Sequence, residues 1–536
     1  MSPAADLLIS NARIFSAAAE RPWTGALAVQ GSRIVFCGDQ SAARAWIGPA
    51  TRQIDAGGGS LLPGLIDSHF HLLYGALDMD GMQLGPVSTY AELSEAVLAY
   101  AAAHPAEAWL RGSGLRYNTG PGPGPLTRQH LDALVPERPM YINAFDGHTS
   151  WANTLALQQA GILGGGEAGP NSEIVLGTDG TATGELREPG AFMPVSSLIP
   201  KPDEARKSAL LREALRLNAS FGITSVHNMN SSPAEVDLYA GLLAQEELTC
   251  RLYLPYSASP DTPLPALESE ALALKQRLSG EILRAGALKL FIDGVIEGYT
   301  GLLVEPYADR PDTCGAANYE QEHFQRLVIE ADRLSLQLFT HSVGDMGVRW
   351  ILDAYAAARR ANGRTDARHR IEHIELVHPA DLPRFAALGV IASMQPLHAP
   401  ARVDELDIWP GRVGPGRWPF SFAWQDLREA GATLIFGSDW PVVTQDPYRA
   451  LAHAVARSTW APGLPNQRQS LRQALLSYTR DAAFAEFQEH QKGQLRPGYL
   501  ADLVLFEENL FELDPPALTA TRPLLTVMDG KIVYER

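Results

Sequence analysis

Eight short apolar runs constrain the fold of this chain more than any other feature. Runs that are apolar throughout over this length are typical of strands buried on both faces of a parallel sheet. Stretches rich in Ala, Leu, Arg and Glu, such as residues 202–217 and 324–334, lie between most of them and resemble helices. Eight parallel strands with crossover helices predict an α/β fold, a (β/α)8 barrel of the TIM type. The expected strands are residues 61–71, 222–228, 251–256, 287–293, 337–341, 370–375, 390–395 and 433–439.

Both ends of the chain have the pattern of short antiparallel strands instead. Residues 25–29 and 33–37 flank Gly31-Ser32, and residues 525–528 and 531–534 flank Asp529-Gly530. Dipeptides of this type between apolar runs are hairpin signals, and Asp-Gly is a strong one. We therefore expect residues 1–60 and 485–536 to form one small composite β-sandwich, and residues 61–484 to form the barrel.

The gap between the first two expected strands is far too long for one crossover helix. It contains a strand-like run at 140–144 and a hairpin pattern formed by residues 172–175 and 182–186. We interpret residues 76–200 as an insertion over the barrel mouth, because long insertions there usually shape substrate binding. A separate domain of unrelated function is the alternative.

Polar side chains lie at the carboxyl ends of five expected strands. His69 and His71 point the same way, because alternate side chains of a strand share a face. In a barrel all these ends meet at one mouth, where catalysis takes place. A histidine at a strand end can also cap a loop, and a buried lysine can pair with an acid such as Asp293. Together, however, these residues predict a metal site: His69, His71, Lys289, His341, His373 and Asp439.

Imidazole and carboxylate ligands suit Zn²⁺, with Mn²⁺, Fe²⁺, Co²⁺ or Ni²⁺ as alternatives, and the number of ions is one or two. A bound metal activates water and polarises a carbonyl oxygen. Asp439 can then serve as both metal ligand and general base.

Composition narrows the class of partner. The chain has 536 residues, a net charge of −17 and no basic run, which argues against nucleic acid as a partner. No segment is long and apolar enough to cross a membrane. Three scattered cysteines suit a reducing cytoplasm. We expect a small-molecule substrate, a cytoplasmic location and a homo-oligomer, with a dimer as the simplest form.

Several motifs make the chain similar to the amidohydrolase superfamily, and within it to the YtcJ-like group (amidohydrolase family 3), which includes N-substituted formamide deformylases. This resemblance spans essentially the whole chain, and its motifs are specific in combination. It implies a barrel with a small β-sandwich built from both chain ends. The matching stretches are residues 63–71, 146–151, 184–188, 289–294, 341–345, 370–373, 392–396, 437–441 and 497–503.

The resemblance also implies roles for single residues. It assigns the four histidines and Asp439 as metal ligands, and it implies that Lys289 is N6-carboxylated and bridges two metals. The rival is an unmodified Lys289, paired with Asp293 or with a glutamate of the insertion (Glu185 or Glu188), beside a single metal. His148 is expected to contact substrate or stabilise the developing oxyanion, and loop packing is its alternative role. The expected substrate contacts are His148, Arg187, Glu188, Asp293, Asp345 and Trp440.

The expected function is metal-dependent hydrolysis of C–N, amide-type bonds in a small molecule, with metal-activated water and Asp439 as general base. Hydrolysis of an ester, lactone or carbamate, or deamination, could use the same site. A non-catalytic scaffold is the hypothesis from another class. Residues that depart from the family pattern, such as Met346, Trp440 and Asn228, line the mouth, and therefore the identity of the substrate stays open.

Overall fold

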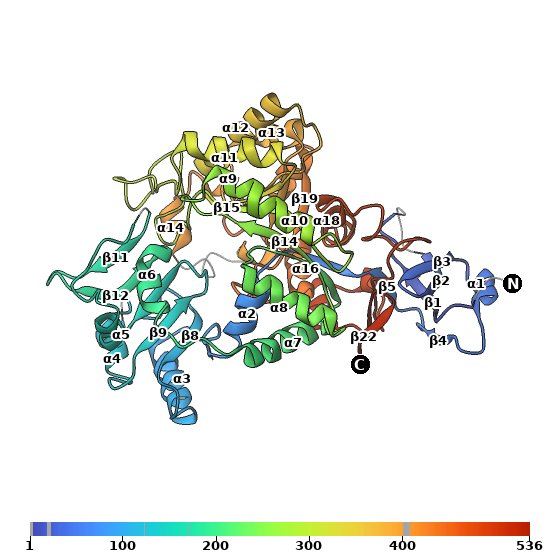
Figure 1. The fold of residues 1–536 in the computed structure, drawn as a ribbon, viewed down its shortest axis with the longest axis horizontal. Coiled ribbons are helices and arrows are strands. Elements are labelled where there is room, and N and C mark those ends of the chain that lie inside the picture. The colour runs from blue at the N-terminus through green and yellow to red at the C-terminus, as the bar shows by residue number, and fades with distance from the viewer. Residues whose placement is uncertain (1–3, 19–22, 123, 170, 400–407) are drawn as a thin grey trace.

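The computed structural model describes residues 4–18, 23–122, 124–169, 171–399 and 408–536. These residues form three sheets, arranged along the long axis of the molecule (Figure 1). A parallel sheet of eight strands lies in the middle, a mixed sheet of eight strands lies at the end that carries both termini, and a sheet of six strands lies at the other end.

The parallel sheet is a barrel, and the eight strands expected from the sequence form it. Its strands follow one another in chain order, and each pairs in parallel with the next. They are β6 (Leu65–Phe70), β13 (Ile223–Asn228), β14 (Arg251–Ser257), β15 (Leu283–Phe291), β16 (Gln337–Ser342), β17 (Arg370–His373), β18 (Ile391–Met394) and β19 (Thr433–Phe436).

The first expected strand, residues 61–71, is two strands in the structure, which corrects the prediction. β5 (Ser60–Pro63) pairs with strands of the mixed sheet, and only β6 belongs to the barrel. Gly64 separates them. Its N–H donates to the carbonyl oxygen of Asp502 at 2.8 Å, and a Cβ on it would lie 2.1 Å from Thr224 Oγ1. The chain therefore crosses from one sheet to the other at a position that only glycine fits.

The first and last barrel strands meet at their carboxyl ends. The N–H of Asp439 donates to the carbonyl oxygen of His69 at 2.7 Å, and the N–H of His71 donates to that of Trp440 at 3.0 Å. At the opposite end, Ile66, Ile391 and Ile435 pack against α18 (Arg480–Ala485) and form an apolar floor. The barrel is therefore filled below the mouth, as TIM barrels are.

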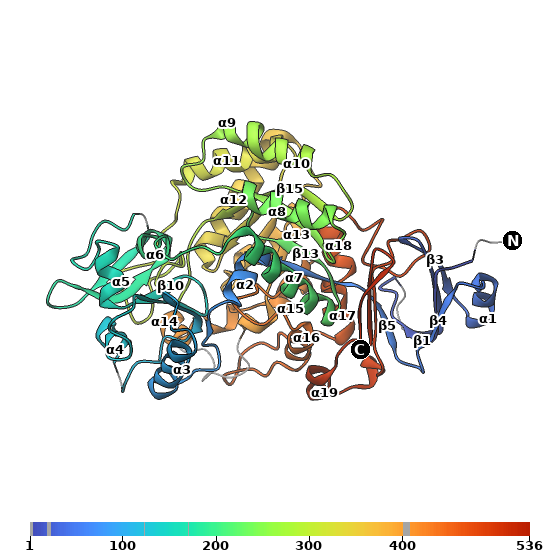
Figure 2. The same cartoon turned by 60° about the horizontal axis from the view of Figure 1, so that its bottom comes forward.

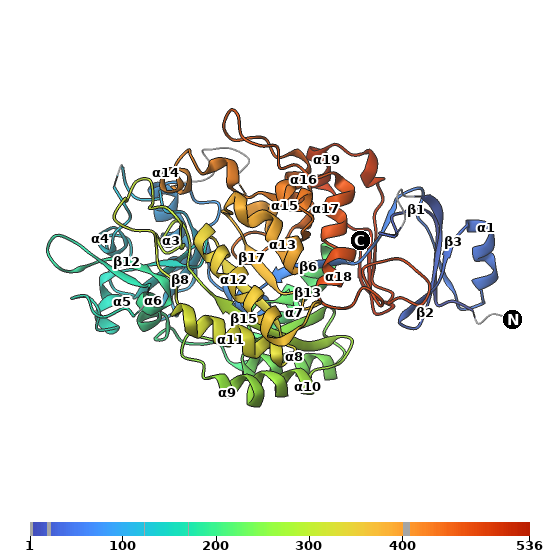
Figure 3. The same ribbon diagram turned by 90° about the horizontal axis from the view of Figure 1, so that it is seen from above.

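Helices follow the barrel strands, and several of them surround the sheet (Figure 3). They are α7 (Glu204–Ser220), α8 (Pro233–Ala244), α9 (Leu264–Ala266), α10 (Ala273–Arg277), α11 (Gln321–Arg333), α12 (Asp345–Asn362), α13 (Leu382–Leu388), α14 (Trp409–Val413), α15 (Trp424–Glu429), α16 (Pro447–Ala456), α17 (Leu471–Ser477) and α18 (Arg480–Ala485). No helix in the described ranges combines the length and the apolar character of a membrane span.

The mixed sheet contains strands from both ends of the chain (Figure 2). Strand β20 pairs with β5, so the C-terminal strands extend a sheet that begins near the N-terminus. The expected hairpins at both ends are formed, by β2 with β3 and by β21 with β22. The remaining elements of this region are β1 (Leu7–Ile14), β2 (Trp23–Gln30), β3 (Arg33–Gly38), α1 (Gln40–Ala43), β4 (Arg52–Asp55), β20 (Leu503–Leu505), α19 (Pro515–Ala520), β21 (Leu525–Met528) and β22 (Lys531–Glu535).

The long segment between β6 and β13 forms the third sheet, in the order β11-β12-β10-β9-β8-β7. The hairpin expected near residue 180 is the antiparallel pair β11 and β12. The elements of this segment are α2 (Leu72–Asp78), β7 (Met82–Gln83), α3 (Tyr90–Ala103), β8 (Leu110–Leu115), α4 (Arg128–Asp132), β9 (Met140–Ala144), β10 (Thr149–Ala152), α5 (Thr154–Gln159), β11 (Glu173–Leu176), β12 (Ala182–Arg187) and α6 (Glu188–Ser196).

Candidate functional site

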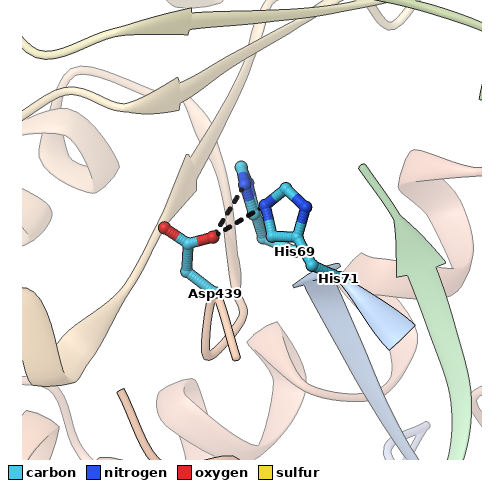
Figure 4. Close-up of side chains that lie close together, drawn as sticks. All are labelled: His69, His71 and Asp439. Carbon is cyan, nitrogen blue, oxygen red and sulfur yellow. Dashed lines mark ion pairs between the residues drawn. The ribbon is translucent and has the colours of Figure 1, made fainter. Parts of the chain in front are cut away.

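Asp439 lies between two pairs of histidines at the barrel mouth. Its Oδ1 is 3.3 Å from His69 Nε2 and 3.1 Å from His71 Nε2, and both rings face this oxygen (Figure 4). Its Oδ2 is 3.8 Å from His373 Nδ1 and 3.7 Å from His398 Nε2. One carboxylate can therefore contribute to two metal-type groups, His69–His71–Asp439 and His373–His398–Asp439.

The backbone around Asp439 is fixed by close contacts with β6. Asp67 Oδ1 accepts hydrogen bonds from the N–H groups of His69 at 3.2 Å and Ser438 at 2.9 Å. A Cβ on Gly437 would lie 2.4 Å from the backbone nitrogen of His69, so this approach requires glycine. Asp439 itself has a φ of 63°, in the left-handed region. Strained backbone of this kind is common where a catalytic group must be held in one place.

The charge states of these residues suit a bound cation. Burial lowers the pKa values of His69 and His373 well below the usual range of histidine. Burial alone would raise the pKa of Asp439, but the neighbouring His69 and His71 lower it overall. Neutral imidazoles beside an ionised carboxylate are the forms that bind a metal. Two buried atoms at this mouth, His398 Nε2 and Lys289 Nζ, have no hydrogen-bond partner among the described residues. The donor set therefore fits a divalent metal.

The ring nitrogens of His69 and His71 that face away from Asp439 are held by neighbours. Nδ1 of His69 donates to Glu372 at 2.7 Å, and Nδ1 of His71 donates to the Asn230 side chain at 3.0 Å. Such contacts fix the tautomer and the orientation of a metal-binding ring, and here they leave Nε2 of both rings directed at Asp439. Nδ1 of His373 lies 2.9 Å from the side-chain oxygen of Gln395.

A chain of buried charged groups continues from His69 through the barrel. Glu372 lies next to Arg370, whose Nε is 2.8 Å from Glu372 Oε1. Arg370 Nη1 donates to His227 Nδ1 at 2.8 Å, and His227 Nε2 is 3.2 Å from Glu486 Oε1. Arg370 and Glu372 are both fully buried. The orientation of His69 therefore depends on an ion pair without access to solvent.

Loss of Arg370 should be strongly destabilising. Arg370→Met leaves the Glu372 carboxylate buried without its ion-pair partner, which typically costs about 3–5 kcal/mol. The free energy of unfolding in urea measures this cost. The matched control is Arg333→Met, which breaks an exposed pair with Glu330 and should cost about 0–1 kcal/mol. Equal effects of the two changes would contradict the structural role of the buried chain.

Lys289 and His341 lie beside these ligands but contact other groups. Burial lowers the pKa of Lys289 to about 8, and its Nζ lies 4.5 Å from the ring centre of Phe291. The His341 ring lies 4.5 Å from the His373 ring, while its Nε2 donates to the carbonyl oxygen of Gly294 at 3.0 Å. The structure thus places both predicted ligands next to the metal-type groups, but only His341 lines the cavity, and neither forms a hydrogen bond or ion pair with Asp439 among the described contacts.

His148 reaches the same mouth from the segment between β9 and β10. Its Nδ1 donates to Glu188 Oε2 at 2.8 Å, and Glu188 Oε1 accepts from Thr300 Oγ1 at 2.5 Å. Burial alone would lower the pKa of His148, but Glu188 and Asp146 raise it to about 9. A cationic imidazole therefore faces the site, 5.4 Å from the ring of His341.

These residues open into one large cavity of about 1160 Å³. His69, His71, His341, His373 and Asp439 line it from the barrel, and His148 lines it from the six-stranded sheet region. A cavity of this size is ample for a small molecule.

The other expected substrate contacts do not line this cavity. Arg187 pairs with Glu173 and Glu185, each at 2.7 Å. Asp293 accepts hydrogen bonds from the N–H groups of Leu302, Val343 and Gly344.

Asp345 accepts from the N–H of Val304, and Trp440 stacks on Phe70. Glu188 acts through His148. All five therefore have positions that support neighbouring groups rather than open onto the cavity.

The cavity is also lined by residues that were not expected at the site. Among them are His398, Asp146, Glu297 and Glu375. His398 follows the carboxyl end of β18 by four residues, a position at which the other ligands could have suggested it. The three acids lie in loops or turns, where strand periodicity gives no direction.

Comparisons with known proteins agree with this site. The model of a family described as the amidohydrolase family matches residues 52–534. The chain is 30% identical to the protein LONG AFTER FAR-RED 3 of Arabidopsis thaliana, with 99% of this chain and 92% of that protein covered. It is 28% identical to the putative amidohydrolase YtcJ of Bacillus subtilis, over 91% of each chain. It is 26% identical to N-substituted formamide deformylase of Arthrobacter pascens, with 100% of this chain and 99% of that protein covered.

Solved structures show the same fold. An uncharacterized metal-dependent hydrolase from Pyrococcus furiosus superposes with a TM-score of 0.72 at 24% identity, over 94% of this chain and 100% of that one. The sequence resemblance is thereby confirmed. The chain belongs to the amidohydrolase family, and it is a metal-dependent hydrolase.

Proposed function

We propose that this protein hydrolyses a C–N bond of amide type in a small molecule. The observation that supports this most directly is the position of Asp439, whose two oxygens face two histidine pairs inside one cavity. Such an arrangement of imidazoles around one carboxylate suits metal-assisted hydrolysis. The relative that is an N-substituted formamide deformylase makes substituted formamides natural first candidates.

His69, His71 and Asp439 would hold one metal ion, and His373, with His398 or His341, would contribute to a second position. Zn²⁺ fits these ligands, and Mn²⁺, Fe²⁺, Co²⁺ and Ni²⁺ are alternatives. When bound, the metal lowers the pKa of water to about 7 and polarises a carbonyl oxygen.

The side chains then supply the proton transfers. Asp439 accepts a proton from the attacking water at a carboxylate oxygen and returns it to the leaving nitrogen. His148 is cationic and donates toward the carbonyl oxygen as negative charge develops there. Glu188 orients His148 from behind through Nδ1, which leaves Nε2 free to face the substrate.

A substrate panel tests the proposal. The metal-loaded enzyme should hydrolyse some members of a set of N-substituted formamides and other small amides, and removal of the metal should abolish the activity. Faster turnover of esters, lactones or carbamates, or release of ammonia from aminated heterocycles, would favour the alternative reactions on this site. Metal binding without turnover of any compound would support a non-catalytic scaffold.

We propose further that Lys289 is N6-carboxylated and bridges two metal ions. An ammonium beside a divalent cation would be repelled, and the lowered pKa of Lys289 favours the neutral amine that reacts with CO₂. The carbamate would supply two oxygen ligands to metals about 3.5–4 Å apart.

Lys289→Ala should therefore bind less metal, and short carboxylic acids should partly restore both metal content and activity. Metal analysis with and without acetate measures this effect. Lys275→Ala is the control, because its Nζ donates to the carbonyl oxygen of Ser335 and Lys275 does not line the cavity. An unmodified ammonium in a crystal structure with one fully occupied metal would contradict the proposal.

The remaining predictions concern organisation. We propose that the strands of both chain ends act as one sandwich domain, residues 1–60 with 485–536, and that residues 76–200 cover the mouth of the 61–484 barrel. The cavity supports the second point, because Tyr141, Asn143 and Phe145 line it. The homodimer and the cytoplasmic location stay predictions from the sequence.

A further inference from the structure

Four carboxylates outside the metal-type groups line the substrate cavity: Asp78, which accepts a hydrogen bond from Ser113 Oγ, and Asp146, Glu297 and Glu375. Asp146 follows β9, Glu297 lies in the loop after β15, and Glu375 follows β17. These three line the same cavity as His69 and Asp439. We call these three residues the acidic wall. Its members come from three separate segments, so the fold, rather than one acidic stretch of sequence, brings them together.

Glu297 has no partner for its charge. It is only 9% exposed, and the one hydrogen-bond donor to its side chain is its own backbone N–H, while no other described residue forms a hydrogen bond or ion pair with it. A buried carboxylate without a partner is costly, so proteins retain one mainly where a ligand supplies the partner. Glu297 lines the cavity, where such a ligand can reach it.

Hydrogen bonds tie together the loop that carries Glu297. The N–H groups of Thr300 and Gly301 both donate to the carbonyl oxygen of Val295 at 3.0 Å, and the N–H of Val295 donates to Thr300 Oγ1 at 2.9 Å. Thr300 also donates to Glu188. Glu297 is therefore held in place before any ligand arrives, which reduces the entropic cost of binding.

The other two members of the acidic wall are already held by hydrogen bonds. Glu375 accepts from Trp409 Nε1 at 2.7 Å, and Asp146 accepts from the Tyr117 hydroxyl at 2.7 Å. Burial, together with the charges of Glu375 and Asp146, raises the pKa of Glu297 well above its usual value. A cation in the cavity would offset the repulsion between these carboxylates and would favour the ionised form of Glu297.

No positive group near the acidic wall forms an ion pair with its carboxylates among the described contacts. Arg412 lowers the pKa of Glu297, but its guanidinium lies over the ring of Tyr299 at 3.9 Å and forms no ion pair with the wall. His148 is committed to Glu188 through Nδ1. The residues that line the cavity also include Arg111, Arg116, Lys201 and Arg449. None of these four forms an ion pair with a member of the acidic wall among the described contacts.

Aromatic side chains accompany the acidic wall. Phe145, Trp409 and Phe422 line the cavity, and the rings of Trp409 and Phe422 are 5.3 Å apart. Phe145 directly precedes Asp146, and Trp409 donates to Glu375. Ring faces next to carboxylates attract ammonium groups through cation–π and ionic contacts together.

We propose that the acidic wall binds an ammonium group of the substrate, so that the enzyme acts on small amide-type molecules that carry a positive amino group. This inference rests on the proposed function, because it assigns a substrate class to the same cavity. Glu297 is the main contact, while Asp146, Glu375 and the aromatic rings complete the subsite.

Binding to the metal-loaded enzyme tests the proposal without turnover. Isothermal titration calorimetry should show benzylammonium binding at least about tenfold more tightly than neutral benzyl alcohol. Benzyltrimethylammonium, which cannot coordinate a metal, should share this preference. Glu297→Gln should remove most of the difference and leave the affinity for benzyl alcohol unchanged.

Glu305→Gln is the matched control, because Glu305 lies in the same loop but is exposed and does not line the cavity. It should keep the preference for the cation. Equal affinities for charged and neutral probes, or an unchanged preference in Glu297→Gln, would overturn the ammonium subsite. Hydrolysis of neutral amides alongside such a result would leave the proposed function standing. Binding of the cations by a protein that hydrolyses nothing would refute the function and keep the subsite.

Discussion

The His69→Ala/His71→Ala variant is expected to lose its metal and its activity together. These two imidazoles are two of the three ligands in the group His69–His71–Asp439. No other described histidine forms a contact with Asp439 Oδ1. Metal analysis of the purified protein should fall from about one to two equivalents of a divalent transition metal to the background, and hydrolysis of any substrate found with the panel should fall below detection.

The control for this experiment is His490→Ala, because the His490 side chain is exposed and does not line the cavity. It should bind as much metal as the unmodified protein. Circular dichroism should show a folded double variant, since the helices and sheets do not depend on the two rings. Full activity in protein that contains no metal would contradict the assignment of this site.

The barrel could be predicted because its strands are short, buried and rich in apolar residues, and because helix-like segments separate most of them. Runs of this kind indicate strands without reference to distant residues. The split at Gly64 could not be predicted in this way, because the run of residues 61–66 is apolar on both sides of Pro63-Gly64. What divides it is contact with Asp502 and Thr224, two residues far away in the chain.

The metal-type residues could be predicted for a related reason. His69, His71, His373 and Asp439 lie at or just after strand ends, where the direction of a side chain follows from the strand. His398 lies in the turn after β18, beyond the reach of this rule. Asp439 was expected to be a ligand, but its position between two histidine pairs depends on the closure of the barrel.

Five of the six expected substrate contacts do not line the cavity. Arg187, Asp293 and Asp345 are polar residues near the mouth, and sequence does not distinguish a group that faces a cavity from one that holds a loop. Asp293 accepts three backbone hydrogen bonds, which uses its carboxylate for the fold. Glu297 lies four residues later and faces the cavity instead.

Asp439→Asn should keep the fold and lose most of the catalysis. Asparagine has nearly the same shape, and the backbone contact of residue 439 with His69 does not involve the side chain. The amide cannot accept a proton from water, and therefore kcat should fall roughly 10²–10⁴-fold or more, a typical contribution of general acid–base catalysis.

Since Asp439 also faces the histidine pairs, metal content must be measured beside kcat. A variant that keeps at least one metal equivalent but loses kcat would assign the loss to proton transfer, because ligand binding is then intact. Asp261→Asn, an exposed residue outside the cavity, is the control and should keep full activity. If Asp439→Asn retains the kcat of the unmodified enzyme, Asp439 takes no part in proton transfer, and another group at the mouth must carry the proton.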